Sequence, residues 1–139
     1  MALRHVSLPN QALLRLLNEP QGYLVENPGT DFVEIASYNL RTHLDWEKLV
    51  PKKCRVVVTA SGNELGWKAV DIYDVSREIQ ICQREWGGTG VQRTLRGPWT
   101  DFPLKNYRGD DVIAVRVKGS SSTEDITLYV VDLQILYYG

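Results

Sequence analysis

Short runs in which hydrophobic and polar residues alternate follow one another along most of the chain. They begin after Asn27-Pro28-Gly29, a turn signal in which proline fixes φ and glycine accepts a positive φ. The runs are rich in valine, isoleucine, threonine and tyrosine, as half-buried strands usually are. This pattern predicts strands at residues 31–38, 53–60, 67–73, 78–82, 91–95, 112–118 and 126–137.

The connections between these runs indicate the fold class. Glycine- and serine-rich clusters separate the strands, and no helical pattern lies between them, which favours an antiparallel β-sandwich over a parallel α/β sheet. The run at 126–137 is longer than a typical strand of about five or six residues, so we expect it to bend or to pair in two sheets. These features favour a jelly roll, with an immunoglobulin-like sandwich or an OB-type barrel as alternatives.

The N-terminal segment has a different pattern. Between two prolines, a short stretch places four leucines on one side of a predicted two-turn helix. These leucines are Leu13, Leu14, Leu16 and Leu17. Two turns are not stable alone in water, so the leucine face must dock on this domain or on another protein. The chain is therefore divided into an arm with a short helix, residues 1–30, and a mainly β domain, residues 31–139.

Length, charge and cysteine content exclude several classes of protein. The chain has 139 residues, enough for one domain, and its net charge of −1 gives no general attraction to nucleic acid or to an anionic membrane. No apolar run reaches the length of a membrane span or signal peptide, so we expect a complete chain made in the cytosol. Cys54 and Cys82 lie in strand-like runs, where buried free thiols are expected, or one disulfide in an oxidising compartment.

Residues that could carry catalysis or bind metals are few. His5 and His43 have no Gly-x-Ser-x-Gly elbow nearby, and the chain has no Cys-x-x-Cys pair. The glycine-rich stretch 87–90 lacks the Lys-Ser/Thr ending of a phosphate-binding loop and is interpreted as a hairpin loop. Asp110 and Asp111 are interpreted as a solvated turn. We therefore expect no enzymatic activity, no cofactor and no metal.

The tryptophans are the residues best suited to form a binding surface. Among the tryptophans, Trp86, in the glycine-rich loop, and Trp99, in Gly97-Pro98-Trp99, are the two most suited to exposure and could stack on sugar rings, but burial is the favoured interpretation for both because large aromatic side chains usually pack. Trp67 lies in a strand-like run and is expected in the core. The middle of the chain is mildly basic, but the overall negative charge argues against a nucleic-acid partner.

The layout of these segments is similar to that of small jelly-roll proteins of tailed bacteriophages. The similarity rests on the arm, the run 56–62, the Gly66-Trp67 strand, the turn 95–99 and the closing strand 128–135. Among those proteins the chain most resembles the capsid decoration, or cement, proteins. The resemblance is one of strand layout over residues 31–138, and no capsid-contact motif can be matched residue by residue.

This resemblance implies a function that can be tested. Cement proteins commonly form trimers on the outer capsid surface, bind the major capsid protein through an arm, and strengthen the shell. By that resemblance the four leucines and Tyr23 would contact the shell or a sister subunit, and the chain would be made in the host cytoplasm and end in the virion. The alternative is a carbohydrate-binding module or a receptor-binding tip of a tail fibre, with Trp86 and Trp99 as its platform.

Overall fold

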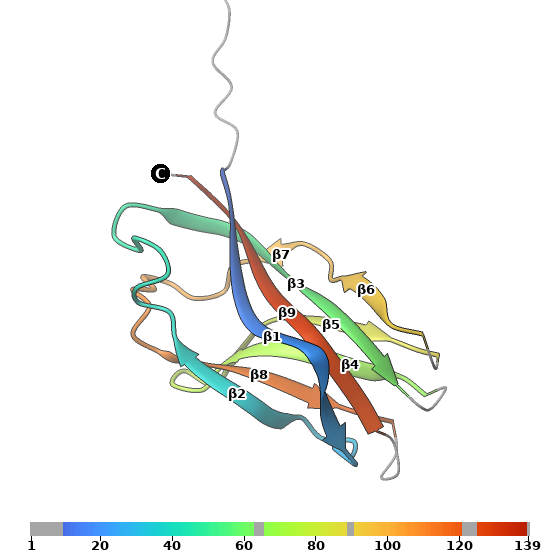
Figure 1. Ribbon diagram of the computed structural model, residues 1–139. Coiled ribbons are helices and arrows are strands. Elements are labelled where there is room, and N and C mark those ends of the chain that lie inside the picture. The colour runs from blue at the N-terminus through green and yellow to red at the C-terminus, as the bar shows by residue number, and fades with distance from the viewer. Residues whose placement is uncertain (1–9, 63–65, 89–90, 121–124, 139) are drawn as a thin grey trace, which may run out of the picture.

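Two antiparallel sheets packed face to face make up the protein (Figure 1). The computed structural model describes residues 10–62, 66–88, 91–120 and 125–138. Within these residues the strands are β1 (Asn10–Glu26), β2 (Val33–Asn39), β3 (Val50–Gly62), β4 (Lys68–Asp74), β5 (Ile79–Trp86), β6 (Arg93–Arg96), β7 (Thr100–Asp101), β8 (Val112–Lys118) and β9 (Asp125–Tyr138). No helix occurs in the described part of the chain.

The strand order confirms the predicted antiparallel sandwich. Sheet A has the order β1-β9-β3-β6, with β7 also paired to β3, and sheet B has the order β2-β8-β4-β5. Alternate residues of β3, Val56 and Val58 among them, are buried between the sheets, and so are Val70 and Ile72 of β4. The period of two read from the sequence therefore marks the side of each strand that faces the core.

The prediction of an N-terminal helix is wrong. Residues 10–26 form β1, an edge strand of sheet A that pairs with β9 from Asn10 opposite Tyr137 to Glu26 opposite Asp125. A two-turn helix would have satisfied few backbone groups, whereas the long edge of β9 offers hydrogen bonds along the whole segment. Pro20 lies in the irregular stretch between Asn18 and Tyr23, where the ladder is interrupted and no strand N–H is required.

The long C-terminal strand confirms one expectation and corrects another. β9 has 14 residues, as the long alternating run predicted. It does not cross between sheets: it pairs with β1 on one side and with β3 on the other, all within sheet A. Register shifts on both neighbours, such as the one between Thr59 and Ala60 of β3, let this long strand twist while it stays paired.

A buried ion pair lies on the outer side of sheet B. The neighbours of Asp71 in β4, Val70 and Ile72, face the core, so the side chain of Asp71 points to the opposite side of the sheet. Asp71 is nevertheless fully buried. Arg116 of β8 donates Nε–H and Nη2–H to the two carboxylate oxygens of Asp71, at 2.9 and 2.5 Å. The guanidinium group of Arg116 lies over the rings of Tyr73, at 3.6 Å, and Phe32, at 4.6 Å. The ion pair between Arg116 and Asp71, its two hydrogen bonds and the cation–π contact with Tyr73 therefore stabilise the pairing of β8 with β4.

Candidate binding surfaces

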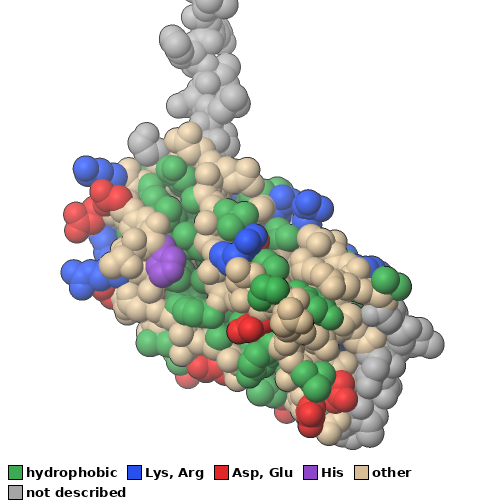
Figure 2. Space-filling view, viewed as in Figure 1, with side chains coloured by type: hydrophobic (Ala, Val, Ile, Leu, Met, Phe, Trp, Pro, Cys, Tyr) green, Lys and Arg blue, Asp and Glu red, His purple; other side chains and the backbone are tan. Residues whose placement is uncertain are grey.

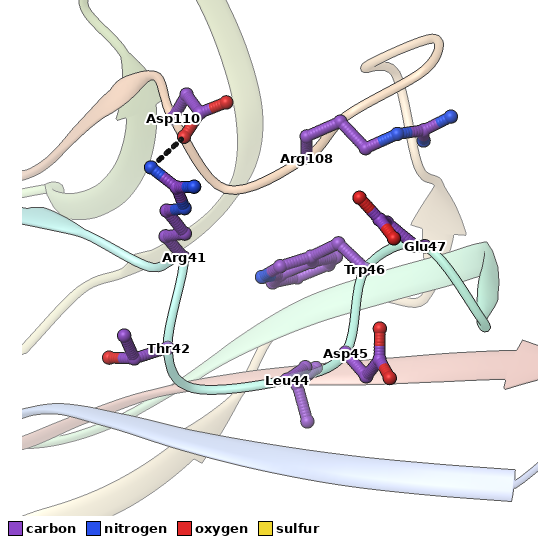
Figure 3. Close-up of a pocket in the computed structure, with 8 residues that line it drawn as sticks. All are labelled: Arg41, Thr42, Leu44, Asp45, Trp46, Glu47, Arg108 and Asp110. Atoms are coloured by element: carbon purple, nitrogen blue, oxygen red, sulfur yellow. Dashed lines mark ion pairs between the residues drawn. The ribbon is translucent and has the colours of Figure 1, made fainter.

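A pocket of about 530 Å³ opens at one end of the sandwich, where the loops 40–49 and 102–111 meet (Figure 3). Its lining residues are Arg41, Thr42, Leu44, Asp45, Trp46, Glu47, Arg108 and Asp110. A second hollow of about 470 Å³ shares Trp46, Glu47 and Arg108 with the first. The sequence pattern predicted no pocket at this position; it indicated only that Asp110 belongs to a solvated turn.

The base of the pocket is rigid. Trp46 is buried, donates its indole N–H to the carbonyl oxygen of Leu40 at 2.8 Å, and meets the ring of Tyr107 edge-on at a centroid distance of 4.6 Å. Gly109 has φ of 85°, and a Cβ there would lie 2.5 Å from the Cα of Arg41. Only glycine fits at this position, so the two loops are held together at one close contact.

The rim of the pocket carries charges of both signs. In Figure 3 Arg41 points toward Asp110, and their ion pair measures 3.7 Å between Nη1 and Oδ1. Both side chains are largely exposed, so the pair contributes little to stability. None of the described residues that line the pocket is a histidine or cysteine, and the mixed charges favour neither an anionic nor a cationic ligand.

Buried carboxylates form a cluster beside this pocket. The Arg77 side chain pairs with Asp111 at 2.6 Å and donates Nη1–H to the carbonyl oxygen of Lys105 at 2.7 Å. Burial, together with a hydrogen bond to Asp111, raises the pKa of Asp74 to about 6. Burial also raises the pKa of Tyr107. Within the described residues no group of three or more histidine, cysteine or acidic side chains is placed to hold a metal ion. The contacts of Arg77 instead hold the loop 105–111 against the turn after β4.

The exposure of the tryptophans agrees with one prediction and contradicts another. Trp86 is only 4% exposed, as the favoured interpretation had it, because it faces the core from β5 beside Lys68, and it is therefore no ligand platform. Trp67, expected in the core, is 69% exposed. Trp99 is half-buried, and the guanidinium group of Arg55 covers its ring at 4.3 Å from the centroid. The sequence-predicted pair Trp86 and Trp99 therefore does not form an open platform.

Trp67 instead forms the wall of a shallow hollow of about 290 Å³ on sheet B. The other lining residues are Gln83, Arg84, Glu85 and Pro98. An exposed indole ring surrounded by amide, guanidinium and carboxylate groups offers a flat apolar surface with hydrogen-bonding groups at its edges. Such a combination suits a ligand with one apolar face and several hydroxyl groups.

Three of the four leucines predicted to dock the arm are buried, and the fourth is half exposed. Leu14, Leu16 and Leu17 are buried in the core between the sheets, so they are unavailable to a partner. Leu13 remains 50% exposed and Tyr23 40% exposed. The predicted leucine face is therefore divided, because a strand sends Leu13 and Leu14 to opposite sides of sheet A. The register shift between Arg15 and Leu17 allows the consecutive Leu16 and Leu17 both to be buried.

The outer face of sheet A carries exposed apolar side chains. Leu14 and Val25 of β1 face the core, so Leu13 and Leu24 point outward, and both are about half exposed, at 50% and 53%. We define the A face as Leu13, Leu24, Val50, Leu136 and Tyr138, contributed by β1, β3 and β9. Figure 2, viewed as in Figure 1, shows hydrophobic side chains dispersed among polar and charged ones over the visible side of the molecule.

Several charged side chains on the outer side of sheet A bond to neighbouring groups of the protein. Arg15 of β1 donates two hydrogen bonds to the carboxylate of Asp132 in β9, at 3.0 and 3.1 Å. Arg55 donates its Nε–H to the side-chain oxygen of Gln134 at 2.7 Å. Lys53 pairs with Asp101 of β7. Because these groups already have partners in the sheet, the face can be covered by another protein with little desolvation of unpaired charge.

No protein-family model matches the chain, and no curated protein matches it. None of the described segments forms a helix that is long and apolar enough to span a membrane.

Solved structures share the fold at low sequence identity. Dimeric latent PorU from Porphyromonas gingivalis is 11% identical, with a TM-score of 0.52 over 93% of this chain. VP2 of infectious bursal disease virus, in the structure of a subviral particle, is 10% identical, with a TM-score of 0.50 over 93% of this chain. The CBM36-1 domain of a xylanase from the hindgut metagenome of Trinervitermes trinervoides is 11% identical, with a lower TM-score of 0.48, and the match covers 89% of this chain and 96% of that domain.

The first two matches cover only part of the larger proteins. The chain spans 13% of the PorU chain and 33% of the VP2 chain. These comparisons establish that the protein has the jelly-roll type of β-sandwich also found in a viral capsid domain. At these identities the likeness is one of fold.

Proposed function

We propose that this chain is a non-enzymatic structural protein, a decoration or cement protein that binds the outer surface of a bacteriophage shell as a homotrimer and stabilises it. The observation that carries the proposal is the A face, which presents apolar side chains on a paired sheet while the neighbouring Arg15 and Arg55 bond to Asp132 and Gln134. The fold shared with VP2 supports a structural role.

The A face suits a permanent protein contact for two physical reasons. Side chains on a paired sheet are already ordered, so binding costs less conformational entropy than ordering a free arm would. Burying a leucine stabilises a contact by roughly 1.5–3 kcal/mol. Because a trimer held together through this face presents three copies of the chain to a symmetric shell, even moderate shell contacts of each copy add up to tight binding, which is lost when the trimer dissociates.

The strand replaces the detachable arm of the sequence-based hypothesis. Contact with the shell or with a sister subunit is made by the outward residues of β1, Leu13 and Leu24. Tyr23, which is opposite the core residue Leu128, lies on the other side of the strand and is 40% exposed. The inward leucines of the same strand hold the domain together. The major capsid protein and further copies of this chain are the proposed partners.

A double substitution on the A face is expected to abolish shell binding. Replacing Leu13→Glu and Leu24→Glu places two unpaired carboxylates in the contact, and losing two buried leucines weakens binding by about 100-fold or more. The measurement is co-sedimentation of the purified protein with undecorated shells built from the capsid protein encoded with the chain. Both positions are about half exposed, at 50% and 53%, so the variant should keep its fold, which circular dichroism checks.

The matched control adds the same two charges elsewhere. Val75→Glu with Val91→Glu alters exposed positions outside the A face and should sediment with shells like the unaltered protein. Equal binding of all three proteins would rule out the A face as the contact. Failure of the unaltered protein to bind shells would argue against the cement function itself.

A second candidate function is glycan binding, and the exposure of Trp67 favours it. Its indole ring is 69% exposed and is flanked by Gln83 and Glu85, whose polar groups could bond sugar hydroxyls. In this reading the platform is Trp67, in place of the sequence-predicted Trp86 and Trp99.

The glycan hypothesis predicts a difference between two tryptophans. Trp67→Ala should abolish binding on a glycan array without lowering thermal stability, because little of its ring is packed. Trp99→Ala, which removes the ring stacked on Arg55, should leave glycan binding intact. An array on which the unaltered protein binds nothing would eliminate this candidate.

A further inference from the structure

Two cysteines from opposite sheets are buried side by side in the core. Cys54 belongs to β3 of sheet A and Cys82 to β5 of sheet B, and the two side chains are 0% and 4% exposed. Both are free thiols in this structure. Neither contributes to the A face or to the hollow around Trp67, so the proposed function leaves them without a role.

The contacts of Cys54 place it next to Cys82. The Sγ of Cys54 lies 3.6 Å from the carbonyl oxygen of Ile81, which belongs to the peptide bond that joins Ile81 to Cys82. The two thiols also affect each other's pKa. A hydrogen bond with the Cys82 thiol lowers the pKa of Cys54. Burial is the main cause that raises the pKa of Cys82, and the neighbouring Cys54 thiol raises it further. The thiols are therefore neighbours across the core.

The backbones of β3 and β5 approach one another at this edge of the sandwich. Gly97, in the turn between β6 and β7, donates its N–H to the carbonyl oxygen of Val56 at 2.7 Å. A Cβ at Gly97 would lie 3.0 Å from that oxygen and 3.0 Å from the carbonyl oxygen of Gln83. One glycine thus touches β3 two residues after Cys54 and β5 one residue after Cys82. The short distance between Cα atoms that a disulfide requires, about 4.4–6.8 Å, is compatible with this approach.

We propose that Cys54 and Cys82 are a disulfide-forming pair that joins sheet A to sheet B when the protein folds in the presence of a disulfide oxidant. The inference is independent of the proposed function. The oxidant is a small-molecule disulfide such as oxidised glutathione.

The reaction proceeds by two exchanges. The thiolate of Cys54 attacks the glutathione disulfide, which forms a protein–glutathione mixed disulfide and releases one glutathione thiolate. The thiolate of Cys82 then attacks the Cys54 sulfur and releases the second glutathione. The protein loses two electrons and two protons, and the glutathione disulfide is reduced to two thiols. Because both sulfurs are buried in the folded protein, the exchange takes place before the sheets close.

The disulfide should stabilise the fold. It closes a loop of about 28 residues and so restricts the unfolded chain, which is expected to raise the melting temperature by about 10 °C.

The experiment is refolding in a glutathione redox buffer. The full chain is unfolded in denaturant with reductant and is then refolded with reduced and oxidised glutathione. The expected product has lost about 2 Da by intact mass, as removal of two hydrogens requires. It has no thiol that reacts with Ellman's reagent in denaturant, and it melts about 10 °C higher than the same chain refolded with dithiothreitol.

Matched variants separate the bridge from other redox effects. Cys54→Ser and Cys82→Ser should each leave one reactive thiol and show no drop in melting temperature with dithiothreitol. If either variant fails to fold, the unaltered protein alone decides. Folded protein that keeps both thiols or carries only glutathione adducts would overturn the proposal, and so would a bridged form that melts no higher than the dithiol form.

Discussion

A chain that lacks residues 1–20 is expected to lose the sandwich fold, whereas a chain that lacks only residues 1–9 is expected to fold. The longer deletion removes most of β1 and with it Leu14, Leu16 and Leu17 from the core. Three buried leucines contribute roughly 5–9 kcal/mol, which approaches the whole stability of a typical domain, about 5–15 kcal/mol. The deletion also leaves one edge of β9 unpaired and open to aggregation.

Thermal unfolding followed by circular dichroism compares the two truncated proteins. The shorter deletion keeps β1 intact and should melt cooperatively near the temperature of the full chain. The longer deletion should give no cooperative transition. A stable, cooperatively folded protein without residues 1–20 would mean that the segment is a separable arm and that β1 is dispensable.

Replacing Arg116→Met is expected to lower the free energy of unfolding by about 3–5 kcal/mol. The change leaves the fully buried carboxylate of Asp71 without its cation, and an uncompensated buried charge is among the most costly defects in a protein. Gln80, which donates to Asp71 at 3.0 Å, cannot replace the lost charge.

Urea unfolding at neutral pH provides the measurement, with a second variant as the control. Combining Arg116→Met with Asp71→Asn removes both charges and keeps the hydrogen-bond partner of Gln80, so it should recover most of the lost stability. A loss below about 1 kcal/mol for Arg116→Met alone would mean that water solvates Asp71 after the substitution and that the pair contributes little to clamping β4 to β8.

The strands of the domain body could be predicted because their alternation is strong and local. In β3 and β8 valine and isoleucine occur where a period of two puts the core, and the structure buries those positions. The segment 10–26 could not be predicted in the same way. Its leucine pairs fit one face of a helix as well as one face of a strand, and leucine favours helices. The partner that decides between the two is β9, which is more than a hundred residues away.

Side-chain exposure was harder to predict than the strands. Trp67 and Trp86 both lie at the open end of the β4–β5 hairpin, and only the register of β4 against β5, with Lys68 opposite Trp86, determines which ring faces the core. The glycines after Trp86 suggested an exposed loop, but the tryptophan itself is still part of β5. The pocket at Trp46 was missed because it is assembled from two loops that are distant in sequence.

The solution mass of the purified protein, measured by light scattering, tests most directly the claim that the A face is a contact surface. The chain has a mass of 15.8 kDa, so we predict a trimer of about 47 kDa for the unaltered protein, which the Leu13→Glu and Leu24→Glu substitutions convert to monomer. Trimers of both proteins would place the subunit contact elsewhere on the molecule. A monomeric unaltered protein at all concentrations would contradict self-assembly through the A face.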